Sequence, residues 1–381
     1  MSTKSIPAKN RQIRSEVSAG GSLKLSLETT PTPTPGEQEV LIKVLAAPMN
    51  PSDLALLIGP GDVSTLQETG TADSPEVQMQ IPDYAMPYLS GRLDQSLPGG
   101  NEGAGIVVAA GDKAQNLMGK MVSVAGGQMF AEYCVAPGYA CLEVADDCDA
   151  RDVCSSFVNP MTVLAMLETM RADGFKALIN TGAASNLGRM MIKVCQDDGI
   201  PLVNIVRREE HVQELQALGA EYVCNSSDDN FAEQLQEAIA ATGAMIAFDC
   251  IGGGKLADQL LTAMEAVAAR SQKDYSRYGT EVHKQVYIYG GLDRSATPLS
   301  RSYGLYWSVG GWLLTAALAR FGMEKTIEFK TRVASELQTT FASHYTAEVS
   351  LAGALSGDAI RNYAKMASGE KYLVLPHADS K

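Results

Sequence analysis

The chain has 381 residues, a length that usually serves two hydrophobic cores. Its formal net charge is -13, with acidic residues spread along the whole chain, which disfavours a nucleic-acid partner. The seven cysteines include no Cys-x-x-Cys pair and favour reduced thiols over a disulfide framework. No run approaches the roughly 18 apolar residues of a membrane span, so we expect a cytoplasmic protein without a membrane partner.

The region before residue 157 contains short strands interrupted by Pro and Gly, with little helical periodicity. Strands are predicted at residues 40–47, 105–110 and 121–124, which indicates a mostly β domain. Residues 59–98 show weak periodicity and exceed the usual length of a connection. They predict a lid over the active site or a poorly ordered loop, and we favour the lid. Within this stretch, Arg92 can either hold an anionic group or pair with Asp94.

From residue 176 to residue 291, short apolar runs alternate with amphipathic helical stretches. This alternation is typical of βαβ units around a doubly wound parallel sheet, in which a nucleotide binds at the carboxyl ends of the strands. The predicted strands are 177–180, 202–206, 221–224, 245–250 and 286–289, with helices at 211–218 and 231–241. A helical stretch at 315–337 and a strand at 371–375, expected to pair back onto the first domain, follow. The predicted domains are therefore 1–156 with 340–381, and 157–339.

A glycine-containing turn lies between the first of these strands and its helix. In Thr181-Gly-Ala-Ala-Ser-Asn-Leu-Gly188, small residues at Ala183, Ser185 and Gly188 fill the three positions of a dinucleotide fingerprint, although only the last is glycine. The alternative is an ordinary tight turn. The expected phosphate-binding residues are Gly182, Ala184, Ser185, Asn186, Leu187 and Gly188.

The second strand of this region ends in Arg207 and Arg208, where an NAD-specific site would place an acidic residue. Two guanidinium groups there can bind a 2'-phosphate, which predicts NADP(H) as the cofactor. The alternative is that both arginines are solvated charges paired with Glu209 and Glu210 at the helix entry.

Several segments in the expected order resemble the medium-chain dehydrogenase/reductase superfamily. They are Asn50-Pro-Ser-Asp53, the stretch from Pro98 to Gly111, Phe130-Ala-Glu-Tyr133 and Val158-Asn-Pro-Met-Thr-Val163. The resemblance is strongest to 2-enoyl thioester reductases and quinone reductases. It implies an α/β Rossmann domain plus a mostly β GroES-like domain, and a small-molecule conjugated acceptor as the substrate.

The resemblance also bears on metal binding. Alcohol dehydrogenases of this superfamily hold zinc with a Cys in the early turn and a His in Gly-His-Glu, where this chain has Met49, Asn50 and Asn101. We therefore expect no metal, and hydride delivery to an acceptor already activated by conjugation. Cys134, Cys141, Cys148 and Cys154 are expected to be buried small hydrophobic residues.

The same resemblance suggests further site residues. Asn50 is expected near the nicotinamide, and Tyr84 or Tyr88 is a candidate proton donor, although aromatic packing is the alternative for each tyrosine. The remaining expected cofactor contacts are Asn159, Thr162, Cys250, Gly252, Tyr289, Gly290, Gly291 and Lys371, of which Asn159 can instead be an N-cap.

The segment Gly310-Gly-Trp-Leu-Leu314 resembles the superfamily strand that pairs with its twofold mate, which predicts a homodimer. The alternative is an internal strand with a buried Trp312.

For function, the leading prediction is an NADPH-dependent quinone or enone reductase. A 2-enoyl thioester reductase and a non-catalytic NADPH-binding sensor stay open, whereas a zinc alcohol dehydrogenase would require a stoichiometric metal.

Overall fold

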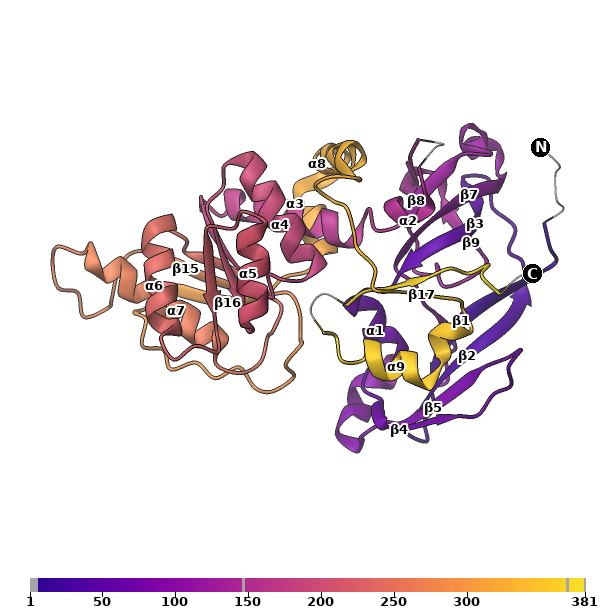
Figure 1. The fold of residues 1–381 in the computed structure, drawn as a ribbon, viewed down its shortest axis with the longest axis horizontal. Coiled ribbons are helices and arrows are strands. Elements are labelled where there is room, and N and C mark those ends of the chain that lie inside the picture. Colours follow the sequence, from indigo (N-terminus) through magenta and orange to yellow (C-terminus); the bar gives the residue numbers. More distant parts are fainter. Residues whose placement is uncertain (1–5, 146–147, 368–369, 380–381) are drawn as a thin grey trace. The chain divides into compact units, whose positions relative to one another are not determined.

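The computed structural model describes residues 6–145, 148–367 and 370–379, and the chain forms two compact units (Figure 1). Unit 1 consists of residues 1–158 and 333–381, and unit 2 consists of residues 159–332. Unit 1 is therefore discontinuous in sequence. No helix among the described residues is long and apolar enough to cross a membrane.

Unit 1 is built from two sheets. The first has the order β4-β5-β2-β1-β6, and the second has the order β10-β8-β7-β3-β18-β17, with β9 also paired to β3. The strands are β1 (Lys9–Val17), β2 (Ser22–Pro31), β3 (Glu39–Pro48), β4 (Asp62–Glu68), β5 (Glu76–Gln80), β6 (Leu97–Pro98), β7 (Glu102–Ala110), β8 (Met121–Ala125), β9 (Tyr133–Pro137), β10 (Leu142–Glu143), β17 (Ala347–Val349) and β18 (Tyr372–Val374). Its short helices are α1 (Pro51–Leu57), α2 (Ala150–Val153), α9 (Gly357–Tyr363) and the 3-10 helices η1 (Asp83–Arg92), η2 (Asp112–Leu117), η3 (Gly138–Ala140) and η4 (Gly353–Leu355).

The end of the chain completes the second sheet of unit 1. Strand β18 pairs antiparallel with β3, with Leu373 opposite Pro48, and parallel with β17. Leu373 and Val374 are fully buried, so this short strand is held by core packing as well as by its ladder. The prediction that a strand near residues 371–375 returns to the first domain is confirmed.

Residues 59–98 do not form a poorly ordered loop, because much of this stretch belongs to the first sheet. Strands β4 and β5 form an antiparallel pair, and β5 continues the first sheet by pairing with β2, with Leu23 opposite Met79. Val77 and Met79 are buried, whereas Gln78 and Gln80 are exposed, which is the alternation of a strand with one face on the core. The strand was missed because this five-residue pattern lies between Pro- and Gly-rich segments.

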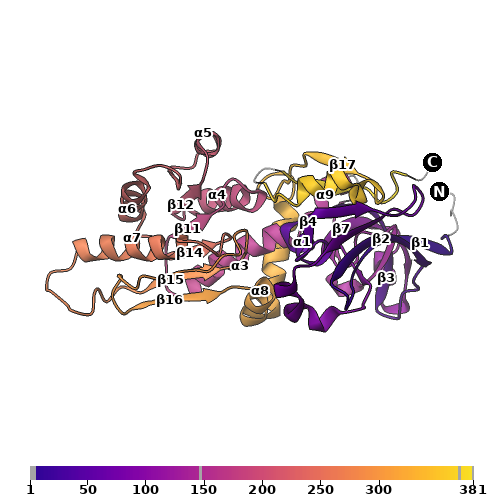
Figure 2. The same ribbon diagram turned by 90° about the horizontal axis from the view of Figure 1, so that it is seen from below.

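Unit 2 is a six-stranded parallel sheet with helices on both faces (Figure 2). The strand order is β13-β12-β11-β14-β15-β16, a doubly wound arrangement whose strand order reverses between β11 and β14. The strands are β11 (Leu178–Thr181), β12 (Leu202–Val206), β13 (Tyr222–Asn225), β14 (Ile246–Asp249), β15 (Lys284–Ile288) and β16 (Trp307–Gly311). The helices are α3 (Val158–Ala172), α4 (Asn186–Asp198), α5 (Glu209–Ala217), α6 (Phe231–Thr242), α7 (Leu256–Arg270) and α8 (Leu314–Glu336).

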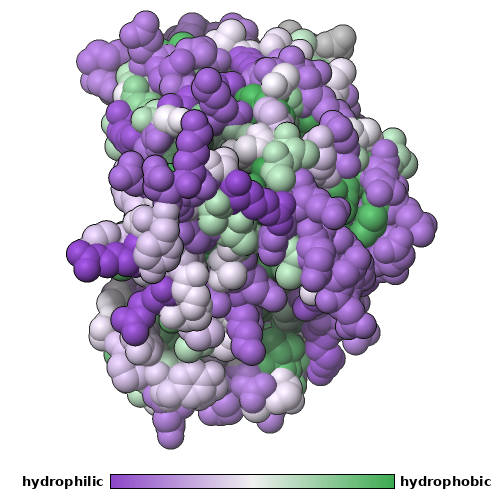
Figure 3. Space-filling model, turned by 90° about the vertical axis from the view of Figure 1, so that its left-hand side faces the viewer, coloured by the Kyte–Doolittle hydropathy of each residue, from purple (hydrophilic) through white to green (hydrophobic). Residues whose placement is uncertain are grey.

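Alternate residues of each strand face opposite sides of this sheet. Ile179, Ala247 and Val286 pack against α6 and α7 in one core. On the opposite face, Phe248 contacts Trp312 edge to face, and the indole N–H of Trp312 donates to Thr169 of α3 at 3.1 Å. Figure 3 views the side on which α6 and α7 lie in Figure 1, where hydrophilic residues dominate and hydrophobic residues form small, separate patches.

The end of unit 2 differs in detail from the sequence prediction. The strand expected at residues 310–314 lies earlier, at Trp307–Gly311, and Trp312 is half-buried just beyond it. The long helical stretch is interrupted at Gly322, where φ is 82°. A left-handed backbone of this kind favours glycine and ends the regular helical hydrogen bonding locally.

Candidate functional site

The first part of the candidate site is the turn between β11 and α4. Gly182 has φ of 62°, and Ser185 caps α4 by accepting the N–H of Gly188 at 3.1 Å. A Cβ at Gly188 would overlap the carbonyl oxygen of Ala183, which explains the glycine. The backbone N–H groups of Ala184 and Leu187 have no partner among the described residues. These donors and the amino end of α4 fit the pyrophosphate of a dinucleotide.

The side chains of Thr181 and Asp249, which sequence reasoning did not select, connect this turn to the turn after β14. Asp249, fully buried at the end of β14, accepts the Thr181 hydroxyl at 2.7 Å and the N–H groups of Ile251 and Gly252 at 3.0 and 3.1 Å. The Thr181 oxygen in turn accepts the N–H of Cys250 at 2.9 Å. The two turns on either side of the strand-order reversal are thereby held together. The sequence feature that could have identified Asp249 is an Asp at the end of a buried apolar strand.

The two arginines after β12 differ in their contacts. Arg208 precedes α5, ion-pairs with Glu210 at 2.9 Å and lies 2.7 Å from His211 Nε2. Its pairing with an acidic residue agrees with the alternative proposed from the sequence. The guanidinium of Arg207 is exposed and has no partner within the described part of the chain. Arg207 is therefore the more available of the two for an anionic group.

The turns after β14 and β15 complete this edge of unit 2. Gly252 has φ of 82°, and a Cβ at Gly290 would overlap the backbone of Cys250, whereas a Cβ at Gly291 would meet no atom within 4 Å. Burial raises the pKa of the Cys250 thiol to about 11 and also raises the pKa of Tyr289. Both groups are neutral at pH 7, so this edge presents backbone groups and uncharged side chains.

A second cluster lies in unit 1, around two buried carboxylates. Asp53 accepts the backbone N–H groups of Asn50 and Asn101 at 2.8 and 2.7 Å, which joins the early turn to the Gly-Gly-Asn-Glu segment. Glu102 accepts the Asn50 side-chain amide at 2.9 Å and the backbone N–H of Val158, at the start of α3, at 2.8 Å. Burial raises the pKa of Asp53 to about 7.

Lys371 lies in unit 1 and is directed into its interior. Its ammonium group donates to the Ser155 hydroxyl at 2.9 Å and lies 5.6 Å from the centre of the Tyr345 ring. The Tyr345 hydroxyl is 2.8 Å from the same Ser155 oxygen and 3.2 Å from the Cys154 sulfur. Burial lowers the pKa of Lys371, and the carboxylate of Glu102 opposes that change. Sequence reasoning expected a cofactor contact here and did not find this polar cluster.

The remaining expected site residues have the following positions. Tyr84 and Tyr88 lie on η1 with 80% and 88% of their surfaces exposed, and no described contact joins them to Asn50. Asn159 and Thr162 are buried in the first turns of α3. Asn159 is not the N-cap, because the helix begins one residue earlier at Val158.

Arg92 does not pair with Asp94, which corrects one of its two expected roles. Its guanidinium donates to the carbonyl of Leu56 at 3.0 Å and to the Ser15 hydroxyl at 2.9 Å, and burial lowers its pKa. Asp94 instead accepts the backbone N–H of Ala19. Arg92 therefore braces α1 against β1.

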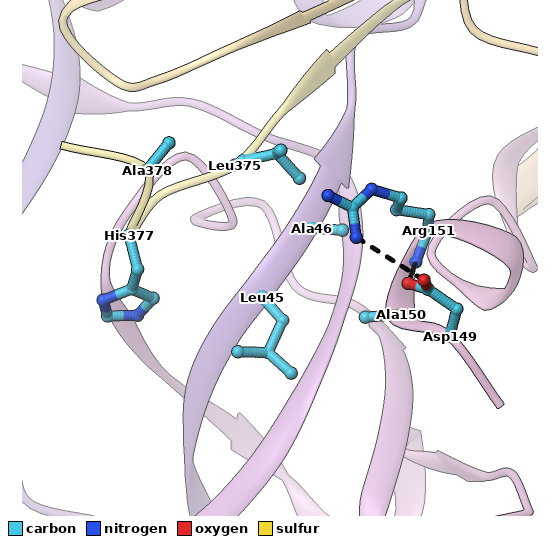
Figure 4. Close-up of a pocket in the computed structure, with 8 residues that line it drawn as sticks. All are labelled: Leu45, Ala46, Asp149, Ala150, Arg151, Leu375, His377 and Ala378. Carbon is cyan, nitrogen blue, oxygen red and sulfur yellow. Dashed lines mark hydrogen bonds and ion pairs between the residues drawn. The ribbon is translucent and has the colours of Figure 1, made fainter. Parts of the chain in front are cut away.

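A cavity of about 400 Å³ lies elsewhere in unit 1 (Figure 4). It is lined by Leu45, Ala46, Asp149, Ala150, Arg151, Leu375, His377 and Ala378. Arg151 is paired with Asp149 at 3.5 Å and with Glu348 at 2.9 Å, and His377 is 3.1 Å from the carbonyl of Glu132. Its charged groups are thus occupied by neighbouring residues, and it shares no residue with the two clusters above.

All seven cysteines lie among the described residues, and none of them forms a disulfide there. Cys134 and Cys154 are buried, as expected, and burial raises the pKa of each thiol to about 12. Cys141 and Cys148 are only half-buried, which corrects the prediction that they are core residues. Within the described residues, no three His, Cys, Asp or Glu side chains are grouped so as to hold a metal ion.

Comparison with known proteins places this fold in context. A family model described as zinc-binding dehydrogenase matches residues 187–268. The mitochondrial enoyl-[acyl-carrier-protein] reductase of Xenopus tropicalis is 26% identical over 238 residues, which cover 59% of this chain and 59% of that protein. An NAD-dependent alcohol dehydrogenase from Sulfurisphaera tokodaii is 24% identical and is matched over 67% of its length. The chain thus spans about three fifths of the first of these relatives.

The likeness to solved structures extends over nearly the whole chain. A candidate NADPH:quinone reductase from Mesorhizobium loti superposes with a TM-score of 0.75 and 26% identity, covering 98% of this chain and 100% of that one. A second candidate NADPH:quinone reductase, from Bacillus thuringiensis, has a TM-score of 0.72 at 18% identity and supports the fold alone. With its doubly wound unit and separate mostly β unit, the chain belongs to the medium-chain dehydrogenase/reductase superfamily.

Proposed function

We propose that the protein is an NADPH-dependent oxidoreductase that transfers hydride to a quinone or another conjugated acceptor. The observation that carries this proposal is the edge of unit 2 at Gly182–Gly188 and Arg207. There, the backbone N–H groups of Ala184 and Leu187 lie at the amino end of α4 and have no partner in the described chain. The guanidinium of Arg207, which is also unpaired in the described chain, follows the neighbouring strand β12. This combination suits a pyrophosphate together with a 2'-phosphate.

The residues of this edge have separable roles in binding the dinucleotide. Ala184, Leu187 and the α4 terminus would hold the pyrophosphate, and Arg207 would bind the 2'-phosphate. Asp249 fixes the spacing of the turns through Thr181. A bound nicotinamide dinucleotide would supply the hydride.

We further propose that the reaction does not use zinc. The positions that resemble the zinc ligands of alcohol dehydrogenases hold Met49, Asn50 and Asn101. A thioether and two amides are poor zinc ligands compared with thiolate and imidazole. Moreover, the Asn50 amide is already bound to Glu102, and that of Asn101 to the Ser52 hydroxyl at 2.9 Å. An acceptor activated by its own conjugation fits such a site.

A 2-enoyl thioester reductase is the second candidate function. It is favoured by the mitochondrial enoyl-[acyl-carrier-protein] reductases of Xenopus tropicalis and Caenorhabditis elegans, which are 26% and 25% identical to this chain. The exposed Tyr84 and Tyr88 would need to approach the substrate to donate a proton in this reaction. A non-catalytic NADPH sensor is the third outcome that an assay must separate.

The test is oxidation of NADPH by the purified protein, with a small quinone panel and a short 2-enoyl thioester as acceptors. Matched NADH reactions measure cofactor preference, and chelator-treated protein measures zinc dependence. Quinone turnover that prefers NADPH and survives chelation supports the proposal. Thioester turnover alone supports the second candidate, and tight NADPH binding without turnover supports a sensor. Loss of activity on chelation, restored by zinc, would refute the zinc-independent reaction.

We also propose that the protein forms a homodimer through β16. This strand is at the edge of the unit 2 sheet, so its outer backbone groups face no further strand of the described chain. Leu305 and Leu313, on either side of it, are 74% and 64% exposed. Sedimentation analysis of the wild type and of a Val309→Pro variant tests this assembly, and a monomeric wild type would refute it.

A further inference from the structure

The side chain of Arg208 is bound on the side of α5 by two groups. Its backbone is extended, with φ of -135° and ψ of 140°, and an extended backbone directs successive side chains to opposite sides. The guanidinium lies 2.7 Å from His211 Nε2 and 2.9 Å from Glu210 Oε1. The Glu210 side chain is 65% exposed, and such a surface pair contributes little, whereas His211 is only 8% exposed. His211 is therefore the main partner of Arg208.

The short contact with Arg208 fixes the protonation state of His211. A guanidinium carries only donors, so Nε2 must accept, and the imidazole must be neutral with its proton on Nδ1. An imidazolium ion has a donor on each nitrogen and would repel Arg208. Burial, and next the charge of Arg208, lower the pKa of His211 and favour the neutral ring. If Arg208 moves away, a buried acceptor loses its donor, which is costly.

The neighbouring Arg207 is fixed at its backbone but not at its side chain. Its carbonyl accepts the Ser227 hydroxyl at 2.9 Å, and the carbonyl of Val206 accepts the N–H of Ser226 at 2.8 Å. The end of β12 is thereby tied to the turn after β13. The Arg207 guanidinium has no partner among the described residues. The two arginines at this strand end thus differ in availability, because only Arg208 is bound to a buried histidine.

We propose that His211 is a specificity-determining residue that withholds Arg208 from the 2'-phosphate of the cofactor, so that Arg207 alone binds this phosphate while His211 is neutral. The inference rests on the proposed function, because it concerns the same cofactor site. It adds a residue that limits the preference for NADPH over NADH. Release of Arg208 from His211 makes a second guanidinium available to the phosphate and raises that preference.

The test compares dissociation constants of NADP⁺ and NAD⁺, measured by calorimetry at pH 7.5. His211→Leu removes the acceptor and releases Arg208, so Kd for NADP⁺ should fall about 3- to 10-fold while Kd for NAD⁺ stays unchanged. In His211→Gln, the amide oxygen can still accept from Arg208, so both constants should match the wild type. In an Arg208→Ala background, His211→Leu should change neither constant, because no guanidinium remains to be released.

His283→Leu is the matched control. His283 is also a partly buried histidine of unit 2 and lies 2.9 Å from the Ser308 hydroxyl, but it precedes β15, at the edge of the sheet opposite the carboxyl ends of the strands. Both dissociation constants of this control should equal those of the wild type. If NADP⁺ binding by His211→Leu is unchanged or weaker, or if both dinucleotides change equally, the inference is overturned.

The pH dependence of binding gives a second readout. The charged groups that face His211 are Arg208, Glu210 and Glu214 around the start of α5, and Arg189 of α4, which is paired with Glu214 at 2.8 Å. Protonation of His211 expels Arg208, as removal of the ring does. Lowering the pH from 7.5 to 5 should therefore raise the ratio of Kd for NAD⁺ to Kd for NADP⁺ in the wild type relative to His211→Gln. Ionisation of the 2'-phosphate affects both proteins alike, so identical pH profiles would contradict the proposed role.

The binding data also separate this inference from the proposed function. A wild type that prefers NAD⁺, with a His211→Leu variant that gains affinity for NADP⁺ alone, would support the role of His211 and refute the proposed use of NADPH. A wild type that prefers NADP⁺, with a variant that gains no affinity, would leave the proposed function standing and refute the role of His211. If neither protein binds a dinucleotide, both proposals fail.

Discussion

The pKa of Asp53 predicts that unit 1 loses stability as the pH rises towards neutrality. Burial raises this pKa from 3.8 to about 7, and the nearby Glu102 carboxylate raises it further, although two backbone N–H groups oppose the change. A folded-state pKa above the unfolded value means that the folded protein binds the proton more tightly. Its contribution is therefore complete below about pH 4 and is lost as the pH rises through about 7.

The size of the effect follows from the difference between the two pKa values. A change from 3.8 to about 7 corresponds to about 4 kcal/mol in total. About 3 kcal/mol of this is lost between pH 5 and pH 8, where the unfolded carboxylate is already ionised. In Asp53→Asn this component disappears. The difference in unfolding free energy between the wild type and the variant should therefore shrink by about 3 kcal/mol over that range.

Urea unfolding at four pH values measures this difference. Far-UV circular dichroism follows both units, whereas both tryptophans of the chain, Trp307 and Trp312, lie in unit 2 and report on it alone. The pH effect should appear in the dichroism and be absent from the fluorescence if the units unfold separately. Asp73→Asn, at an exposed position, is the control. A wild-type-to-variant difference that is the same at pH 5 and pH 8 would refute the reasoning.

Three further predictions concern unit 2. Arg207→Ala should raise KM for NADPH at least about tenfold and leave KM for NADH unchanged. Arg208→Ala should have a smaller effect, because Arg208 is already paired with Glu210, and equal effects on both cofactors would contradict the prediction. Asn180→Leu should raise the unfolding free energy by about 1 kcal/mol, because neither the nitrogen nor the oxygen of the buried Asn180 amide has a partner among the described residues. A lower unfolding free energy of the variant in urea denaturation would indicate that the amide is hydrogen-bonded. Lys284→Met should cost about 3 kcal/mol by stranding Glu265, which lies 2.5 Å away, and addition of Glu265→Gln should recover part of this loss in the same assay.

The sequence was sufficient to predict the parallel sheet of unit 2 and the turns at the carboxyl ends of its strands. Strand β12 has the predicted limits, because five buried apolar or amide residues lie between Pro201 and Arg207. The turn at Gly182–Gly188 and the glycines after β14 and β15 follow directly from strand ends, which share one edge of a parallel sheet. Here local periodicity and chain order are sufficient to place the residues.

The cluster in unit 1 could not be predicted in the same way. The contact between Asn50 and Glu102 joins residues 52 positions apart, and that between Lys371 and Ser155 joins residues 216 positions apart. Whether Lys371 faces a cofactor or the interior depends on the register of β17 against β18, which is a three-residue pairing without a sequence signature. The motif residues were visible, but their hydrogen-bond partners depend on tertiary packing.

The two buried carboxylates of unit 1 differ in their partners. Glu102 accepts two backbone N–H groups and the side-chain amide of Asn50. Asp53 binds two backbone N–H groups, and a protonated acid still offers lone pairs to both, so its neutral form is compatible with the fold. Lowering the pH should therefore stabilise unit 1 through Asp53 without breaking either of these contacts.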